Sequence, residues 1–111
     1  MHNRILFAIV GAMSMAEPAF ADKEQELAWM SVGMEAVKAR LNDPNSAQFR
    51  NVYLHRGQKN TPFTCGEVNS KKGVGGYDGY QRFISGGSPD STVFQEEIST
   101  FDSVWDDRCV K

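Results

Sequence analysis

The chain has 111 residues, and its 12 Lys and Arg side chains nearly balance its 14 Asp and Glu side chains, which leaves a formal charge of −2. A chain of this length forms one small domain, which excludes a multi-domain enzyme. Because the charge gives no basic excess to neutralise a phosphate backbone, we expect no nucleic-acid partner.

The start of the chain is typical of a secretory signal peptide over residues 1–21. Arg4 precedes an apolar run over residues 5–13, and small residues that a signal peptidase reads follow it, the last of them Ala21. A membrane-spanning helix needs roughly 20 apolar residues, so we expect cleavage after Ala21 and no stable membrane insertion. The mature domain would then cover residues 22–111 and reside in the periplasm or be secreted. The alternative is an ordinary N-terminal core helix.

The two cysteines of the chain are Cys65 and Cys109. In an oxidising compartment two cysteines pair by default, so we predict a Cys65–Cys109 disulfide. Closing a loop of about 45 residues stabilises the fold by about 4 kcal/mol in the loop-closure model. The competing hypothesis is a reactive Cys65 thiol that is activated by His55, the one histidine left after cleavage.

The first element that the mature sequence predicts is an amphipathic helix over residues 23–41. Apolar residues recur there at steps of 3, 4, 3 and 4: Leu27, Met30, Met34, Val37 and Leu41. This spacing places them on one side of a helix, which we expect to face the core, although it could also dock a partner helix. We expect Trp29 and Val32 to broaden the buried face.

Strand and turn signals follow the helix. Asp43 is a candidate cap for a single helical turn over residues 44–47. The remaining predicted elements are strands over residues 49–56, 63–70, 80–85 and, more weakly, 92–98, a glycine-rich loop over 71–79, and a short terminal helix from 101 to 109. The order predicts an α+β domain in which the N-terminal amphipathic helix packs on a three- or four-stranded antiparallel sheet and the disulfide ties the C-terminal helix.

The glycine-rich loop resembles a phosphate-binding loop in composition only. Its glycines at 73, 75 and 79 do not fit G-x-G-x-x-G, and no Lys-Ser/Thr pair follows for a P-loop. We expect these glycines to supply positive φ angles and to let Tyr77 and Tyr80 pack over the backbone.

The sequence does not bring together the other side chains that could act in catalysis or metal binding. Neighbouring carboxylates at 96–97 and at 106–107 point in different directions and are expected to be solvated. His55 and two oxidised cysteines do not make a metal site, so we expect no metal and no cofactor.

Polar and aromatic side chains gather in the predicted hairpins and form a candidate binding patch. Its members are Arg50, Asn51, Glu67, Asn69, Lys71, Lys72, Tyr77, Tyr80 and Arg82. Tyr and Arg are enriched at binding hot spots. In the alternative interpretation, the tyrosines are half-buried, Arg82 pairs with Glu67, and the lysines keep the loop soluble.

Three motifs of the sequence resemble those of a known protein family. Residues 43–52 read DPNSAQFRNV, residues 65–69 read CGEVN, and residues 75–84 read GGYDGYQRFI. This region resembles a family of small exported proteins of Gram-negative bacteria with the pattern DPxSAxFRxV, CGEVN and GGYxGxxRFI. The resemblance implies export and one shared domain, and it carries over no catalytic residue. Lys72 departs from the Asn that we expect in many relatives.

Two functional hypotheses remain. The first is a periplasmic or secreted interaction module that binds an envelope protein or a cell-wall polymer through the candidate patch. The second is a small envelope hydrolase or thiol enzyme that uses Cys65, His55 or Glu67.

Overall fold

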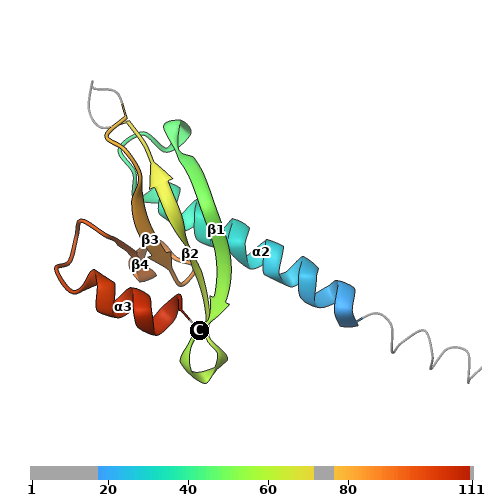
Figure 1. Ribbon diagram of the computed structural model, residues 1–111. Coiled ribbons are helices and arrows are strands. Elements are labelled where there is room, and N and C mark those ends of the chain that lie inside the picture. The colour runs from blue at the N-terminus through green and yellow to red at the C-terminus, as the bar shows by residue number, and fades with distance from the viewer. Residues whose placement is uncertain (1–17, 72–76, 111) are drawn as a thin grey trace, which may run out of the picture.

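The computed structural model describes residues 18–71 and 77–110. Most of the predicted signal peptide and Lys72 of the glycine-rich loop lie outside the described residues. In chain order the elements are the helix α2 (Pro18–Ala39), the 3-10 turn η1 (Pro44–Ser46), the strand β1 (Gln48–Arg56), the 3-10 turn η2 (Gln58–Asn60), the strands β2 (Pro62–Asn69) and β3 (Gln81–Ser85), the 3-10 turn η3 (Pro89–Ser91), the strand β4 (Thr92–Phe94) and the helix α3 (Phe101–Arg108) (Figure 1).

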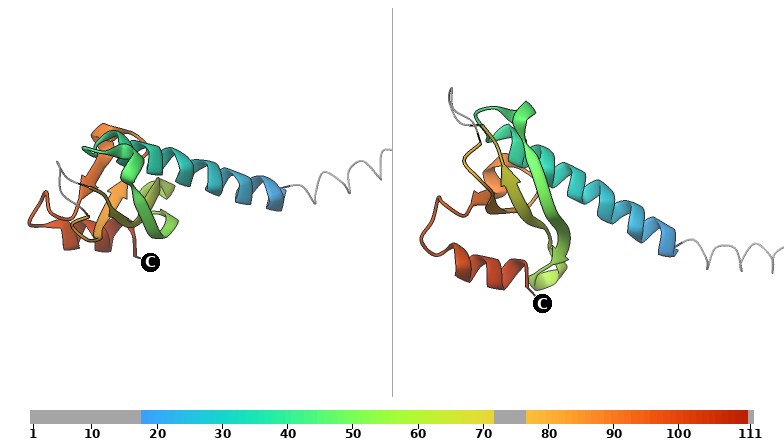
Figure 2. Two further views of the ribbon diagram at one scale, coloured as in Figure 1. Left: turned by 90° about the horizontal axis from the view of Figure 1, so that it is seen from above. Right: turned by 45° about the horizontal axis from the view of Figure 1, so that its top comes forward.

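The four strands form one antiparallel sheet in the order β1-β2-β3-β4, so each strand pairs with its neighbour in the chain. The helices α2 and α3 lie on opposite sides of this sheet (Figure 2). Successive side chains of a strand point to opposite faces, and in β3 Phe83 packs with α2 whereas Ile84 packs with α3. The predicted α+β class is confirmed.

The helix α2 packs on the sheet through its C-terminal half. Val37 is buried against Val68 and Phe83, and Gly33 sits so close to β2 that an added Cβ would lie 2.5 Å from the Cβ of Thr64. The prediction that the apolar side of this helix faces the core is therefore confirmed at Val37. It is wrong at Leu27, whose side chain is 58% exposed. The N-terminal half of α2 extends past the edge of the sheet (Figure 1).

Trp29 and Val32 also stay largely exposed rather than broadening the buried face. The helix ends two residues earlier than predicted, at Ala39. The amides of Arg40 and Leu41 then bond carbonyls three residues back, which tightens the chain into a turn.

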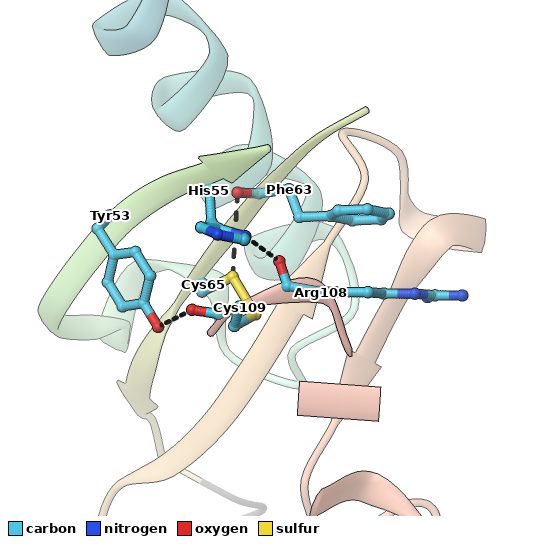
Figure 3. The surroundings of a disulfide bond; sticks show 6 residues. All are labelled: Tyr53, His55, Phe63, Cys65, Arg108 and Cys109. Atoms are coloured by element: carbon cyan, nitrogen blue, oxygen red, sulfur yellow. Dashed lines mark hydrogen bonds between the residues drawn. A yellow bond between two sulfur atoms is a disulfide. The ribbon is translucent and has the colours of Figure 1, made fainter. Parts of the chain in front are cut away.

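The opposite face of the sheet holds the predicted disulfide, which is confirmed. Cys65 of β2 and Cys109 at the end of α3 are bonded, and both are buried with Ile84 and Phe101. Beside them the phenol of Tyr53 donates a hydrogen bond to the carbonyl of Cys109 over 2.8 Å (Figure 3). The C-terminal helix is thus fixed to both β1 and β2.

Two local predictions are wrong. The fourth strand stops at Phe94 because the carboxylate of Glu97 turns back and accepts hydrogen bonds of 2.8 Å from the Phe94 amide and from Nη1 of Arg40. Glu97 is therefore bound rather than freely solvated. Before β1, the turn that follows Asp43 forms as predicted, but the Asp43 side chain does not cap it.

Candidate functional site

The candidate site begins with an irregularity in β1. Arg50 pairs with Glu67 and Tyr53 pairs with Cys65, so two residues of β1 stand opposite the single residue Gly66 of β2. This is a β-bulge, and Asn51 within it has a positive φ of 55°. Asn tolerates the left-handed region better than most residues, which explains how the sequence accommodates the bulge.

Gly66 makes the bulge possible on the β2 side. A Cβ at Gly66 would lie 2.9 Å from Cγ2 and 3.0 Å from Cα of Val52. Any larger residue at position 66 would therefore push the bulged strand away from β2.

The bulge brings Arg50 and Asn51 to the same carboxylate. In a regular strand these neighbours would point to opposite faces, whereas here both bond Glu67. The Arg50 guanidinium donates to the two Glu67 oxygens over 3.3 and 3.1 Å, and Nδ2 of Asn51 donates to Oε1 over 2.8 Å. Three hydrogen bonds thus fix the Glu67 side chain on the sheet surface.

Tyr80 completes the arrangement from the segment before β3. The guanidinium carbon of Arg50 lies 3.7 Å from the centre of the Tyr80 ring, a close cation–π stack. Both side chains remain accessible, since Arg50 is 52% and Tyr80 36% exposed. We call Arg50, Asn51, Glu67 and Tyr80 the Glu67 cluster.

The charges of the cluster stabilise each other. Hydrogen bonds from Arg50 and then Asn51 lower the pKa of Glu67, and the bond to Glu67 raises the pKa of Arg50. Glu67 is therefore ionised at neutral pH. An ionised carboxylate has no proton to donate, so Glu67 does not suit the role of a general acid.

Arg82 of β3 lies next to the cluster, but its side chain contacts α3. It stands opposite Glu67 in the strand register. Its guanidinium nevertheless bonds Asp102 and lies 5.1 and 5.0 Å from the ring centres of Phe101 and Trp105. The predicted Arg82–Glu67 pair is therefore wrong, because α3 supplies a carboxylate and two aromatic rings to the same side chain.

The remaining members of the predicted patch have other surroundings. Asn69 is buried, and its Oδ1 accepts a 3.0 Å hydrogen bond from the amide of Gly79, which has a positive φ of 106°. Lys71 lies 5.7 Å from the ring centre of Tyr77 in an isolated bridge. The structure thus places Asn69 in a supporting role and groups the exposed Lys71 and Tyr77 apart from the Glu67 cluster.

Two aromatic residues near the site were not among the predicted binding residues. The ring of Tyr53 meets the ring of Trp105 edge-on, with centres 6.3 Å apart, and Tyr53 is exposed on β1. Burial raises the pKa of the Tyr53 phenol, which keeps it protonated as the donor to Cys109. The spacing of Trp105 from Phe101 predicted the helix but gave no sign of this contact.

The residues proposed for catalysis are engaged elsewhere. Cys65 is buried in the disulfide and is not a free thiol. Nδ1 of His55 lies 2.8 Å from the carbonyl oxygen of Arg108, and because this oxygen can only accept, the ring N–H donates a hydrogen bond to it (Figure 3). The structure therefore contradicts a Cys65–His55 nucleophile.

A polar hollow of about 210 Å³ adjoins the Glu67 cluster at Tyr80, with Val68, Ser70 and Gln81 among its lining residues. Within residues 18–71 and 77–110, no three His, Cys, Asp or Glu side chains are grouped to hold a metal ion. No helix in this part of the chain is long and apolar enough to span a bilayer. No family model, curated protein or solved structure matches the chain.

Proposed function

We propose that the protein is an exported interaction module that binds another envelope macromolecule through the Glu67 cluster. The observation that carries the proposal is the exposed stack of Arg50 on Tyr80, which Glu67 and Asn51 hold in place. Arg and Tyr dominate binding hot spots because they bury a large area for little loss of conformational freedom. A guanidinium that is already fixed loses still less on binding.

The backbone strain at Asn51 supports a functional role for the cluster. A positive φ at a residue other than Gly costs of the order of 1 kcal/mol and persists only where the surroundings enforce it. Here the strained residue is Asn51, whose Nδ2 donates a hydrogen bond to Glu67 in addition to those from Arg50. Bulges are over-represented at sheet edges and next to active sites, where they can re-aim a side chain.

Among envelope partners we favour a protein over a cell-wall polymer. A sugar binds best to an open aromatic face, but Arg50 already covers one face of Tyr80. The accessible guanidinium and carboxylate edges suit the paired charges and backbone groups of a protein surface.

The disulfide supports residence in the periplasm or outside the cell. Disulfides persist in oxidising compartments and are rare in the cytosol. The Cys65–Cys109 bond together with the predicted signal peptide over residues 1–21 therefore favours export.

Site-specific photo-cross-linking in intact cells tests the proposal. A benzophenone amino acid replaces Tyr80 in one variant and Tyr77 in a matched control, and cross-linked products are identified by mass spectrometry. We expect a defined protein adduct from position 80 that is absent from position 77. The adduct should disappear when Arg50→Ala is added and persist when Arg56→Ala is added, because Arg56 bonds only the nearby Asn60 carbonyl among its described contacts.

Three outcomes would contradict the proposal. A position-80 adduct that survives Arg50→Ala would show that the stack does not contribute to binding. Equal adducts from positions 77 and 80 would show that the cluster is not the contact. A glycan adduct in place of a protein would contradict the preferred partner class.

A further inference from the structure

The two outer strands of the sheet differ in how their free edges are covered. Backbone groups of successive residues in a strand point alternately to its two edges. In β4 the groups of Thr92 and Phe94 point away from β3, because the amide of Gln95 bonds a β3 carbonyl. Both outward groups of Phe94 bond Glu97, whose carboxylate accepts from the amide over 2.8 Å and whose amide donates to the carbonyl over 2.9 Å. The Thr92 carbonyl accepts a 2.7 Å hydrogen bond from Arg40 and its amide bonds η3, so the outer edge of β4 is closed.

The outer edge of β1 is open near the hairpin turn. The Gly57 amide donates to the Thr61 carbonyl over 2.8 Å, which fixes the alternation between β1 and β2. Every second residue before Gly57 also faces β2, which leaves the amides and carbonyls of Leu54 and Arg56 pointing outward. Within the described residues these four groups have no hydrogen-bond partner, and no residue of β1 is buried. The two helices lie over the faces of the sheet and leave this side of β1 uncovered (Figure 1), and we call the four groups the β1 edge.

An open strand edge suits one class of ligand, an extended polypeptide. Only an extended backbone repeats donors and acceptors at the spacing of the edge. The bulge at Asn51 limits the length of the segment, because it interrupts the regular alternation just before Tyr53. The regular part of the edge covers residues 53–56, so an added segment can bond all four groups of the β1 edge.

The side chains of Leu54 and Arg56 indicate what the added segment carries. They share one face of β1, and Leu54 stands opposite Thr64, which lies against α2. Leu54 is half-buried, so an apolar side chain beside it would extend the core on that face. Arg56 is exposed and bonds only the Asn60 carbonyl among its described contacts, so a carboxylate would pair with it across the strands.

The charge around the β1 edge favours an acidic segment over a second copy of this chain. Lys59 of the hairpin turn is exposed, and no described ion pair involves Lys59 or Arg56. If Leu54 of one copy paired with Arg56 of another, the two Arg56 side chains would be diagonal neighbours on one face, about 7 to 8 Å apart. Like charges at this separation oppose the pairing.

We infer that the β1 edge binds an extended segment of a partner protein by β-strand addition, with an apolar side chain beside Leu54 and a carboxylate beside Arg56. The β1 edge consists of backbone groups at positions 54 and 56. The proposed function depends instead on the side chains of the Glu67 cluster, so either can fail without the other.

Amide hydrogen exchange of the purified protein, followed by NMR, tests the inference. In the free protein we expect the amides of Leu54 and Arg56 to exchange at least about tenfold faster than those of Tyr53 and His55, which face β2. The probe is a synthetic ten-residue peptide that alternates Thr with Val and has Glu in place of two of the Val residues. At saturation the peptide should slow exchange at Leu54 and Arg56 by about tenfold or more and leave Tyr53 and His55 unchanged.

Two N-methylated versions of the peptide test whether its backbone makes the contact. One is methylated on the amides of its Thr residues and the other on the amides of its Val and Glu residues, so each lacks the donors of one edge only. We expect one version to bind like the unmodified peptide and the other to lose at least about tenfold in affinity.

A charge exchange tests the role of Arg56. A peptide with Lys in place of each Glu should bind the protein more weakly than the Glu peptide, and Arg56→Glu should reverse this preference. The matched control is Lys71→Glu, which makes the same charge change beyond the other end of β2 and should leave the preference for Glu unchanged. Circular dichroism checks that both variants keep their fold, and Tyr80→Ala should bind the Glu peptide normally.

The remaining outcomes would overturn the inference. These are no protection of Leu54 and Arg56 by the peptide, equal binding of the two methylated versions, or a preference for Glu that survives Arg56→Glu. Slow exchange at both amides in the dilute free protein would show that the chain covers its own edge. Protection that rises with protein concentration without peptide, together with a dimer in sedimentation, would assign the edge to a second copy instead.

Discussion

Reduction of the Cys65–Cys109 disulfide is expected to lower the free energy of unfolding by about 4 kcal/mol. The two cysteines are 44 residues apart in the sequence, and the bond closes this segment into a loop. The closed loop restricts the conformations of the unfolded chain. Reduction of the bond opens the loop and raises the conformational entropy of the unfolded chain by about 13 cal/mol/K. Small domains have a total stability of about 5 to 15 kcal/mol, so the bond supplies a large share of it.

Urea unfolding of the oxidised and the fully reduced chain, followed by tryptophan fluorescence, measures this difference. We expect the midpoint to fall sharply on reduction and the slope to rise, because the reduced unfolded chain is more expanded. Thiol titration in denaturant verifies that reduction is complete. An unchanged midpoint in a sample with two free thiols would refute the loop-closure reasoning.

Three further predictions concern other parts of the fold. Arg50 and Arg40 lower the pKa values of Glu67 and Glu97, so these carboxylates stabilise the fold above their unfolded pKa near 4.5. The unfolding free energy should therefore fall as the pH drops below about 4.5 through the lower folded pKa values, and an acid titration of Glu97→Gln should show a smaller decrease. Gly33→Ala should destabilise the domain by about 1 to 3 kcal/mol in urea unfolding despite its higher helix propensity, because its Cβ would clash with β2; equal or greater stability would contradict that packing. Asn51→Val should lower the unfolding free energy by about 1 to 2 kcal/mol because of the positive φ, whereas Asn51→Gly should be tolerated and lose only the bond to Glu67; equal effects would argue against backbone strain.

The sequence predicted the elements that depend on local pattern. The 3.6-residue spacing predicted α2 and α3, alternating β-rich segments predicted the strands, and two cysteines in a chain that is predicted to be exported predicted their bond. The spacing could not show that Leu27 lies beyond the sheet, because periodicity tells which residues share a side and not how far the opposing surface extends. For the same reason the exposure of Trp29 and Val32 was missed.

The candidate site was only partly predictable. Arg50, Glu67 and Tyr80 were in the predicted patch, but their mutual contacts depend on the bulge at Asn51. A bulge needs a close approach of two strands, here at Gly66, and no local propensity specifies that approach. The one available signal was an Asn within a strand-forming segment, since Asn is disfavoured in strands and enriched at positive φ.

Arg82 illustrates a second limit. The alternative interpretation paired it with Glu67, whereas the carboxylate that it bonds, Asp102, is on α3, which the Cys65–Cys109 bond ties to β2. Such tertiary competition for one side chain is not visible in the sequence.

The intact mass of the native protein, purified from cells without reductant and treated to alkylate free thiols, tests export and disulfide formation in one measurement. We predict the mass of a chain that starts at Asp22 and carries no alkyl group, because both cysteines are bonded to each other. A chain that starts at Met1, or one that carries two alkyl groups, would contradict export and the covalent tie between the sheet and α3.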